Sequence, residues 1–229
     1  MQLSSLFRDF IHILLPKICL SCDTDLLSHE EMLCTSCLYH LPITDFHQDK
    51  NNQTAKQLWG KLDFQYAMSM LYLAKSSRVE QLLYRLKYGN QPEIGEFLGK
   101  YYGKMLQEAG ILNTVDLIIP IPLHRSKLRL RGYNQSSQFA KGLSKAGGIP
   151  WTDRVLIRKK ATVSQTKKSR TERYENVEDV FVLRDAGALE NKHVLLVDDV
   201  LTTGATICSA GNQLVRAGAA VSVATIARA

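Results

Sequence analysis

The sequence lacks the features that would place it in or across a membrane. Within its 229 residues no apolar run approaches the roughly 20 residues that a membrane-spanning helix needs. The N-terminus has no basic segment followed by a continuous apolar run and a small-residue cleavage site, so it is not a convincing signal peptide. There are also no internal repeats. We therefore expect a cytoplasmic protein with one α/β domain and a small appendage.

Acidic residues are missing from one long stretch of a chain whose net charge is +7. None occurs from Leu117 to Thr152, where the basic residues are Arg125, Lys127, Arg129, Arg131, Lys141 and Lys145. A second basic cluster comprises Arg158, Lys159, Lys160, Lys167, Lys168, Arg170 and Arg173. The excess is either a solubility charge or the sign of a polyanionic partner.

The most informative stretch is VLLVDDVLTTGAT, residues 194–206. Its first four residues are two valines and two leucines, and this short apolar run predicts a strand buried on both faces of a parallel sheet. Asp198 and Asp199 follow at the carboxyl end of that strand, where open α/β sheets bind their ligands. A small, hydroxyl-rich loop then leads into a predicted helix; it contains Thr202, Thr203, Gly204, Ala205 and Thr206.

The two halves of this motif favour different ligand groups. The free N–H groups at a helix start suit a phosphate, and Gly204 lets the backbone approach it closely. Two carboxylates repel an anion and prefer hydroxyl groups or a metal ion. A sugar phosphate with a free cis-diol satisfies both halves, and Mg²⁺ held by the phosphates of the ligand fits the same electrostatics.

Two C-x-x-C pairs lie near the N-terminus, separated by eleven residues. Each pair can direct two thiolates to one metal, so together they predict a tetrahedral structural zinc site. A segment of this size has too small a core to fold alone, and metal binding would supply its folding free energy. The predicted ligands are Cys19, Cys22, Cys34 and Cys37.

The remaining pattern predicts alternating strands and helices. Residues 3–14 have the spacing of a short amphipathic helix, which either packs on its own domain or lies on a membrane surface. Residues 44–63 are polar and are interpreted as a linker. Strands are predicted at 67–73, 115–119, 154–158, 177–183 and 221–226, and helices from Ser77 to Gly89, from Pro92 to Gly110 and from about 133 to 146.

Two basic segments are candidate phosphate contacts. Residues 120–132 form a loop after a predicted strand, and as an extended chain it would present Arg125, Lys127, Arg129 and Arg131 on one side. Residues 159–174 contain almost nothing that can be buried, which predicts a long mobile loop. Such a loop either closes over a phosphorylated substrate or is a disordered insertion.

Several motifs together resemble one family. VLLVDDVLTTGAT is similar to the 5-phosphoribosyl-1-pyrophosphate (PRPP) motif of type I phosphoribosyltransferases. The paired C-x-x-C, LKYGNQPE, IPIPLHRSKLRLRGYNQ, SQTKKSRTERYENV and the ending VATIARA resemble the ComF family of phosphoribosyltransferase-like proteins, which includes competence protein ComFC and the GntX group. The resemblance covers nearly the whole chain.

The resemblance implies a type I phosphoribosyltransferase fold over residues 61–229, preceded by an N-terminal helix, a Cys₄ zinc unit and a linker over 1–60. It implies that Asp198 and Asp199 hold the ribose hydroxyls and that Thr202 to Thr206 hold the 5′-phosphate. The loop from Arg125 to Arg131 would meet pyrophosphate. The flexible loop would contribute Gln165, Lys168, Arg170 and Arg173.

The resemblance leaves three functional hypotheses. The chain is a DNA-uptake factor that binds PRPP with Mg²⁺ and handles single-stranded DNA, a phosphoribosyltransferase with an unknown acceptor, or a zinc-stabilised module that binds other competence proteins. Tyr133 and Tyr174 could stack DNA bases or cap a core. The zinc-bearing half is the candidate hood over the acceptor site.

Overall fold

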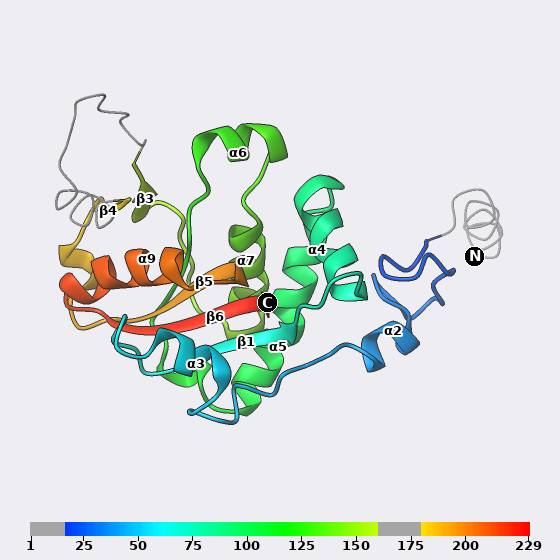
Figure 1. Cartoon of the computed structure of the whole chain (residues 1–229), viewed down its shortest axis with the longest axis horizontal. Coiled ribbons are helices and arrows are strands. Elements are labelled where there is room, and N and C mark those ends of the chain that lie inside the picture. The colour runs from blue at the N-terminus through cyan, green and yellow to red at the C-terminus, as the bar shows by residue number, and fades with distance from the viewer. Residues whose placement is uncertain (1–16, 160–179) are drawn as a thin grey trace, which may run out of the picture.

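A computed structural model describes residues 17–159 and 180–229, so the predicted helix at 3–14 and the four flexible-loop residues lie outside the described residues. Its centre is a sheet of four parallel strands in the order β1-β6-β5-β2 (Figure 1). The strands are β1 (Ala67–Tyr72), β2 (Leu117–Pro120), β5 (His193–Leu201) and β6 (Ala220–Arg228). This confirms the predicted α/β architecture with a parallel sheet.

Apolar side chains cover both faces of this sheet. Along β5, Leu195 and Val197 join one core cluster, whereas Val194 and Leu196 join the other. The first cluster includes α4 (Arg78–Tyr88), α5 (Glu93–Glu108) and α7 (Gln135–Gly147), and the second includes α3 (Gln53–Leu58) and α9 (Ala205–Arg216). Because alternate residues face opposite layers, the apolar run that identified this strand is buried on both sides.

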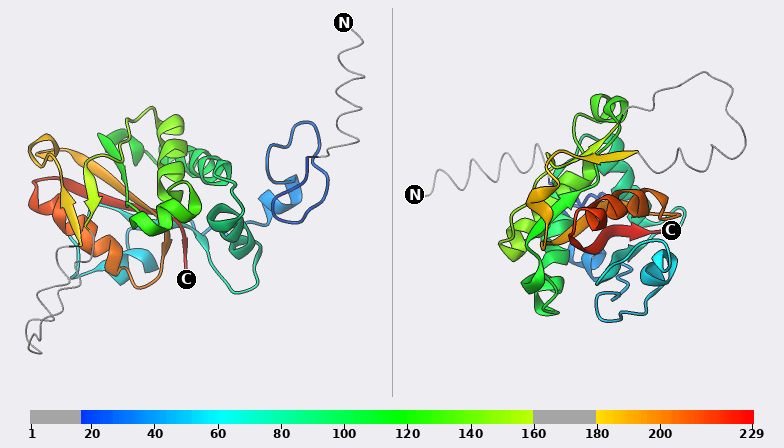
Figure 2. Two further views of the ribbon diagram at one scale, coloured as in Figure 1. Left: turned by 90° about the horizontal axis from the view of Figure 1, so that it is seen from above. Right: turned by 90° about the vertical axis from the view of Figure 1, so that its left-hand side faces the viewer.

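Shorter elements complete the fold. They are α2 (Thr35–Tyr39), η1 (Leu112–Thr114), α6 (Arg125–Arg131), η2 (Gly187–Leu189) and an antiparallel pair of strands, β3 (Leu156–Arg158) with β4 (Phe181–Leu183). Figure 2 shows the segment around α2 at one end of the molecule, next to α4 and α5. Among the described residues, none of the helices has the length and hydropathy needed to span a bilayer.

Helices α5 and α7 approach closely because glycines meet at their contact. A Cβ atom added at Gly142 would lie 2.6 Å from the backbone nitrogen of Lys100 and closer still to the carbonyl oxygen of Glu96. A Cβ atom at Gly99 would likewise meet the backbone of α7. Helix α7 carries residues that reach the functional site, so this contact sets their position as well as the packing.

Gly142→Ala is therefore expected to destabilise the protein. The added methyl group must separate two backbones, and overpacking of this kind outweighs the gain of about 1 kcal/mol in helix propensity, leaving a net loss of about 2 kcal/mol or more. Urea unfolding measures the loss. Gly187→Ala is the matched control because its Cβ would have nothing nearer than 4.0 Å, and equal effects of the two changes would contradict the account.

The predicted linker at 44–63 is wrong for much of its length. Asn52 caps α3, and Ala55 and Leu58 are buried in the second core cluster. Upstream, the Thr44 N–H bonds to the carbonyl oxygen of Met70 in β1. The segment looked like a linker because most of its residues are polar, yet a few apolar side chains suffice to bind it to the sheet. The division into 1–60 and 61–229 stays a prediction.

Candidate functional site

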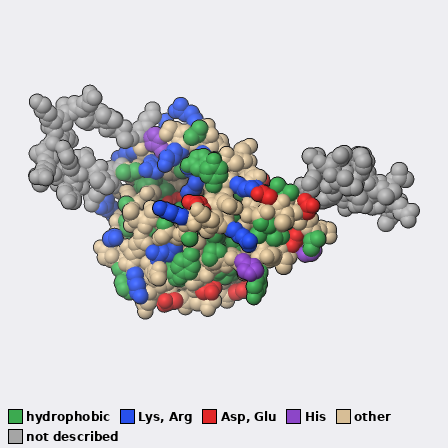
Figure 3. All heavy atoms as spheres, turned by 45° about the vertical axis from the view of Figure 1, so that its right-hand side comes forward, with side chains coloured by type: hydrophobic (Ala, Val, Ile, Leu, Met, Phe, Trp, Pro, Cys, Tyr) green, Lys and Arg blue, Asp and Glu red, His purple; other side chains and the backbone are tan. Residues whose placement is uncertain are grey.

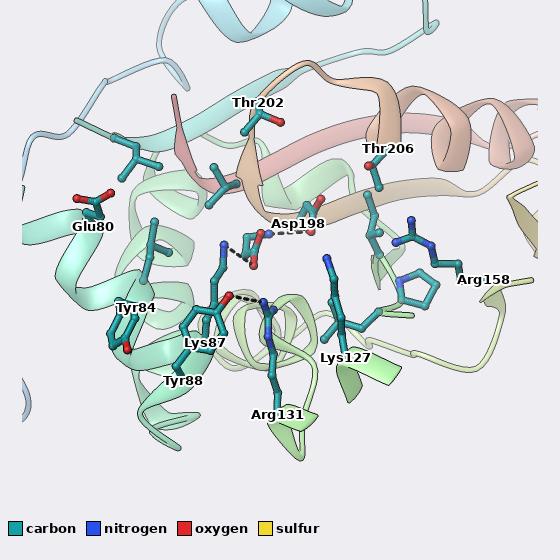
Figure 4. A pocket seen from close by; sticks show the side chains of 17 residues that line it. Glu80, Tyr84, Lys87, Tyr88, Lys127, Arg131, Arg158, Asp198, Thr202 and Thr206 are labelled. Carbon is teal, nitrogen blue, oxygen red and sulfur yellow. Dashed lines mark hydrogen bonds and ion pairs between the residues drawn. The ribbon is translucent and has the colours of Figure 1, made fainter. Parts of the chain in front are cut away.

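A pocket of about 480 Å³ opens at the carboxyl ends of β2 and β5 (Figure 4). Its wall includes Thr202 and Thr206 from residues 202–206, the predicted phosphate loop, together with both aspartates and cations from three other segments. The cations are Lys87 from α4, Lys127 and Arg131 from α6, and Arg158 from β3. The structure therefore joins parts of the sequence that lie more than a hundred residues apart.

The two aspartates have different partners. Asp198 Oδ1 accepts hydrogen bonds from Ser136 Oγ at 2.9 Å and from the Asp199 N–H at 2.9 Å. Asp199 Oδ2 lies 3.1 Å from Lys87 Nζ, the ion pair drawn in Figure 4. One carboxylate is thus held by a hydroxyl and a backbone amide, and the other by a cation. Both are half-buried and border the pocket.

Burial, followed by the charge of Asp199, raises the pKa of Asp198 from 3.8 to about 7. Ser136, the Asp199 N–H and Lys87 oppose the rise but do not cancel it. A carboxyl group with this pKa changes charge near neutral pH. It can therefore exchange a proton with a ligand hydroxyl or lose it when a cation arrives.

This pKa makes Asp198→Asn a stabilising substitution at high pH. The folded protein holds a proton that the unfolded chain has already released, so the free energy of unfolding falls as the pH rises from about 4 to 7. Asparagine cannot ionise and can still accept the two hydrogen bonds. At pH 8 we expect the variant to be more stable by about 2 kcal/mol, with the difference vanishing near pH 4. Urea unfolding at several pH values checks this, and a pH-independent difference would contradict it.

The phosphate loop forms the start of α9. Gly204 is the N-cap, with φ of 80°, a left-handed conformation that favours glycine. A Cβ atom there would also lie 2.8 Å from Leu58 Cδ2, and Gln57 donates a hydrogen bond to the carbonyl oxygen of Thr202. Helix α3 therefore supports the loop from behind. A second, small cavity of about 30 Å³ is lined by Asp198 and by residues 200–207.

The basic segment after β2 is a helix rather than an extended loop. His124 caps α6, which ends at Gly132 with φ of 78°. In a helix, residues four apart share a side. Lys127 and Arg131 accordingly line the pocket, whereas Arg125 and Arg129 do not. The predicted alignment of all four cations on one side is wrong, and only two of them line the pocket that holds the aspartates.

Several residues of the pocket were not predicted from the sequence. Lys87 and Ser136 contact the aspartates directly. Tyr88 accepts a hydrogen bond from Arg131 Nη2 at 3.3 Å. Lys87 and Tyr88 belong to the LKYGNQPE motif, so the sequence did mark them as unusual but gave them no role. By contrast, Tyr133 packs against the core and donates to the Leu86 carbonyl oxygen, and Tyr174 lies outside the described residues.

The four cysteines of the paired C-x-x-C lie together. Their sulfur atoms are all within 4.8 Å of one another, and Cys22 Sγ and Cys34 Sγ are 3.7 Å apart. A tetrahedral zinc ion with bonds of about 2.3 Å would separate its sulfurs by about 3.8 Å, so the cluster fits a metal such as zinc. Backbone N–H groups of Cys34 and Cys37 donate to sulfurs of the cluster, as expected around a metal-binding thiolate.

Helix α4 connects this Cys₄ cluster to the pocket. At its start, Arg78 Nη1 donates to Cys37 Sγ at 3.6 Å, and further along Arg85 pairs with Asp23 at 2.7 Å. At its end, Lys87 reaches Asp199. Within the described residues, however, none from 17 to 60 lines the pocket, so the expected hood from the zinc-bearing half is not found there.

Comparison with known families defines the class of protein. Residues 134–229, which include α7, β5, the phosphate loop and β6, match the phosphoribosyl transferase domain family. With the parallel four-stranded sheet, this confirms the type I phosphoribosyltransferase-like fold. A solved adenine phosphoribosyltransferase aligns over 62% of this chain and 74% of its own, at 17% identity and a TM-score of 0.43, a likeness too low to carry a functional argument.

Several curated proteins are similar to part of this chain. DNA utilization protein YhgH of Escherichia coli O157:H7 is 31% identical over 61% of this chain and 62% of the relative. Competence protein F of Haemophilus influenzae is 32% identical over 55% and 57%, and competence protein ComFC of Bacillus subtilis 35% over 48% and 42%. The chain thus carries a region that matches the phosphoribosyl transferase domain family and is homologous to YhgH and to the competence proteins, the group that its motifs predicted. The match spans less than two thirds of the length of these relatives.

Proposed function

We propose that this chain binds PRPP with Mg²⁺ and acts in the cytoplasm on single-stranded DNA during DNA uptake. One observation carries the PRPP part of the proposal: a single pocket joins a helix-start loop, two carboxylates and a wall of cations. PRPP offers a group for each of these, namely a 5′-phosphate, two ribose hydroxyls and a pyrophosphate. A simple phosphate or a simple diol would leave part of the pocket unmatched.

Each end of the ligand has its own residues in this proposal. The 5′-phosphate accepts hydrogen bonds from the N–H groups of residues 202–206 and from the threonine hydroxyls. The ribose hydroxyls donate to Asp198 and Asp199. Lys127 and Arg131 receive the pyrophosphate, and Mg²⁺ carried with the ligand would reduce the repulsion between the pyrophosphate and the aspartates.

Turnover is a second candidate function, favoured by the same cationic wall. Displacement of pyrophosphate at ribose C1 passes through a transition state in which negative charge grows on the leaving group. Lys127, Arg131 and Arg158 border the pocket in which that charge would develop. The protein would contribute position and charge rather than covalent chemistry, and the acceptor would enter from the open side of the pocket.

Two observations support the DNA part of the proposal: the names of the relatives and the exposed basic residues of α6. YhgH is named a DNA utilization protein, and two relatives are named competence proteins. Lys and Arg side chains gather on the upper part of the face in Figure 3. Arg125 and Arg129 of α6 are exposed and not used by the pocket, so they are available to a DNA backbone. The alternative function is that of a protein-interaction module, in which the Cys₄ unit binds other competence proteins.

Pyrophosphate release distinguishes these functions. Purified protein is mixed with PRPP and Mg²⁺ and with each of a panel of nucleobases, with and without single-stranded DNA. Release that depends on one base establishes a transferase and identifies its acceptor. Binding of PRPP without release under any condition makes the site a sensor and favours the DNA role. Absence of PRPP binding would overturn the proposal.

DNA binding through α6 predicts a changed response to salt. Removing two backbone contacts with Arg125→Ala/Arg129→Ala is expected to reduce the slope of log affinity against log salt by about 1 to 1.5 for a single strand. Fluorescence anisotropy with a labelled oligodeoxynucleotide measures the slope. Lys56→Ala/Lys192→Ala removes the same charge from exposed positions elsewhere and serves as the control. An equal change in both double variants would mean that α6 has no specific role.

A further inference from the structure

Two tyrosines at the mouth of the pocket have no part in the core. Tyr84 and Tyr88 are 64% and 58% exposed, although α4 buries its other face through Val79, Leu82 and Leu86. They lie one helical turn apart, with ring centroids separated by 5.1 Å and planes inclined by 46°. Both line the same pocket as the phosphate loop and the aspartates. Figure 4 shows them on one wall beside Lys87, across the pocket from Thr202 and Thr206.

We infer that Tyr84 and Tyr88 form a stacking platform for a nucleobase. This inference rests on the proposed PRPP site and names the class of acceptor that the site takes. With the phosphate in the loop and the ribose hydroxyls on the aspartates, the rest of the pocket is bounded mainly by α4, α6, residues 121–123 and Arg158. Aromatic rings are the groups there that match the flat face of a base, since stacking tolerates any base.

The surroundings of Tyr88 support a ligand in this place. Arg131 lies over its ring, with Cζ 5.1 Å from the centroid, and Arg131 Nη1 also donates to Gln135 Oε1 at 2.9 Å. These contacts fix the guanidinium beside the ring, although its buried Nε has no partner among the described residues. One arginine thereby orders the ring and faces the anionic part of a nucleotide-like ligand. The base is either free or part of a single strand, and the stacking chemistry is the same for both.

The test compares base binding with PRPP binding in the full chain. Adenine, hypoxanthine and uracil are titrated by calorimetry in the presence of PRPP and Mg²⁺, and oligodeoxythymidylate is titrated beside an abasic oligomer of equal length. Tyr84→Leu/Tyr88→Leu should weaken base or oligodeoxythymidylate binding at least about tenfold more than it weakens PRPP binding. Tyr88→Phe keeps the ring and should retain most of the base affinity.

The control is Tyr39→Leu, because Tyr39 is 84% exposed on the Cys₄ unit and does not line the pocket. It should change none of these affinities. If a free base binds only in the presence of PRPP, the platform takes a free nucleobase. If the protein binds oligodeoxythymidylate more tightly than the abasic oligomer, the platform takes a base within a strand. Unchanged base affinity in the double leucine variant, or no base binding by the unmodified chain, would overturn the platform. Base binding without PRPP binding would instead overturn the proposed function and leave the platform standing.

Discussion

Cys37→Ser is expected to release the metal and disorder the Cys₄ unit. Residues 17–41 bury few apolar side chains of their own, among them Leu33 and Leu41, so we propose that their order depends on a metal bound by the four cysteines. Structural zinc contributes about 10–16 kcal/mol in comparable small units, far more than that small core can replace. Metal analysis should find one ion per chain before the substitution and almost none after it. Hydrogen exchange should show loss of protection across residues 17–41.

Disorder of the Cys₄ unit should also affect the pocket, because α4 contacts both. Without an ordered Cys37 and Asp23, Arg78 and Arg85 lose their partners, and the end of α4 that carries Lys87 is held less firmly. We expect faster hydrogen exchange along α4 but an intact sheet. Cys208→Ser is the matched control, because Cys208 lies on α9 outside the cluster and should leave the metal content unchanged. A full metal content in Cys37→Ser would refute the assignment of this ligand.

Asp198→Asn/Asp199→Asn is expected to weaken PRPP binding about a hundredfold. Each hydrogen bond between a ribose hydroxyl and a carboxylate contributes about 1.5–3 kcal/mol, and an amide accepts a weaker one. At pH 8, where Asp198 is ionised as well, the same double variant removes two negative charges from the pocket, so inorganic pyrophosphate should bind it as well as before or better. Calorimetry with both ligands measures these opposite effects.

Opposite effects on the two ligands are the useful feature of this experiment. A general collapse of the pocket would weaken the binding of both ligands, and urea unfolding of the double variant would show such a collapse directly as a loss of stability. Asp185→Asn is the control, since Asp185 is exposed and lies outside the pocket. If PRPP affinity survives in the double variant, the aspartates do not hold the ribose.

The features that the sequence predicted are those encoded within short segments. In residues 194–206 a strand, two carboxylates near its carboxyl end and a helix start are close in sequence, and chain geometry alone places them together. Strand β5 extends past the predicted four residues and includes both aspartates. The paired C-x-x-C is equally local, because each pair brings its own two sulfurs to one point. The pair Ser76-Ser77 predicted the start of helix α4, and Ser77 is its cap, because its hydroxyl accepts a hydrogen bond from the Glu80 N–H.

The features that the sequence did not predict depend on tertiary contacts or on competing patterns. Leu128 and Leu130 alternate with basic residues and imitate a strand, but their helix propensity and the C-terminal Gly132 give α6 instead. The ion pair between Lys87 and Asp199 joins residues 112 positions apart, so no local pattern reveals it. The sequence predicted four cations from residues 125–131 in the pocket. Because this segment is helical, only two of them line it, and the cations of the pocket are Lys87, Lys127, Arg131 and Arg158.

The most direct measurement compares PRPP with its two halves. Calorimetric titrations in Mg²⁺ use PRPP, ribose 5-phosphate and inorganic pyrophosphate as separate ligands of the full chain. Because one pocket is proposed to hold both ends of the ligand, we predict that PRPP binds with one site per chain and at least tenfold more tightly than either half. Equal affinity for PRPP and pyrophosphate would mean that only the cations bind, and would contradict the account.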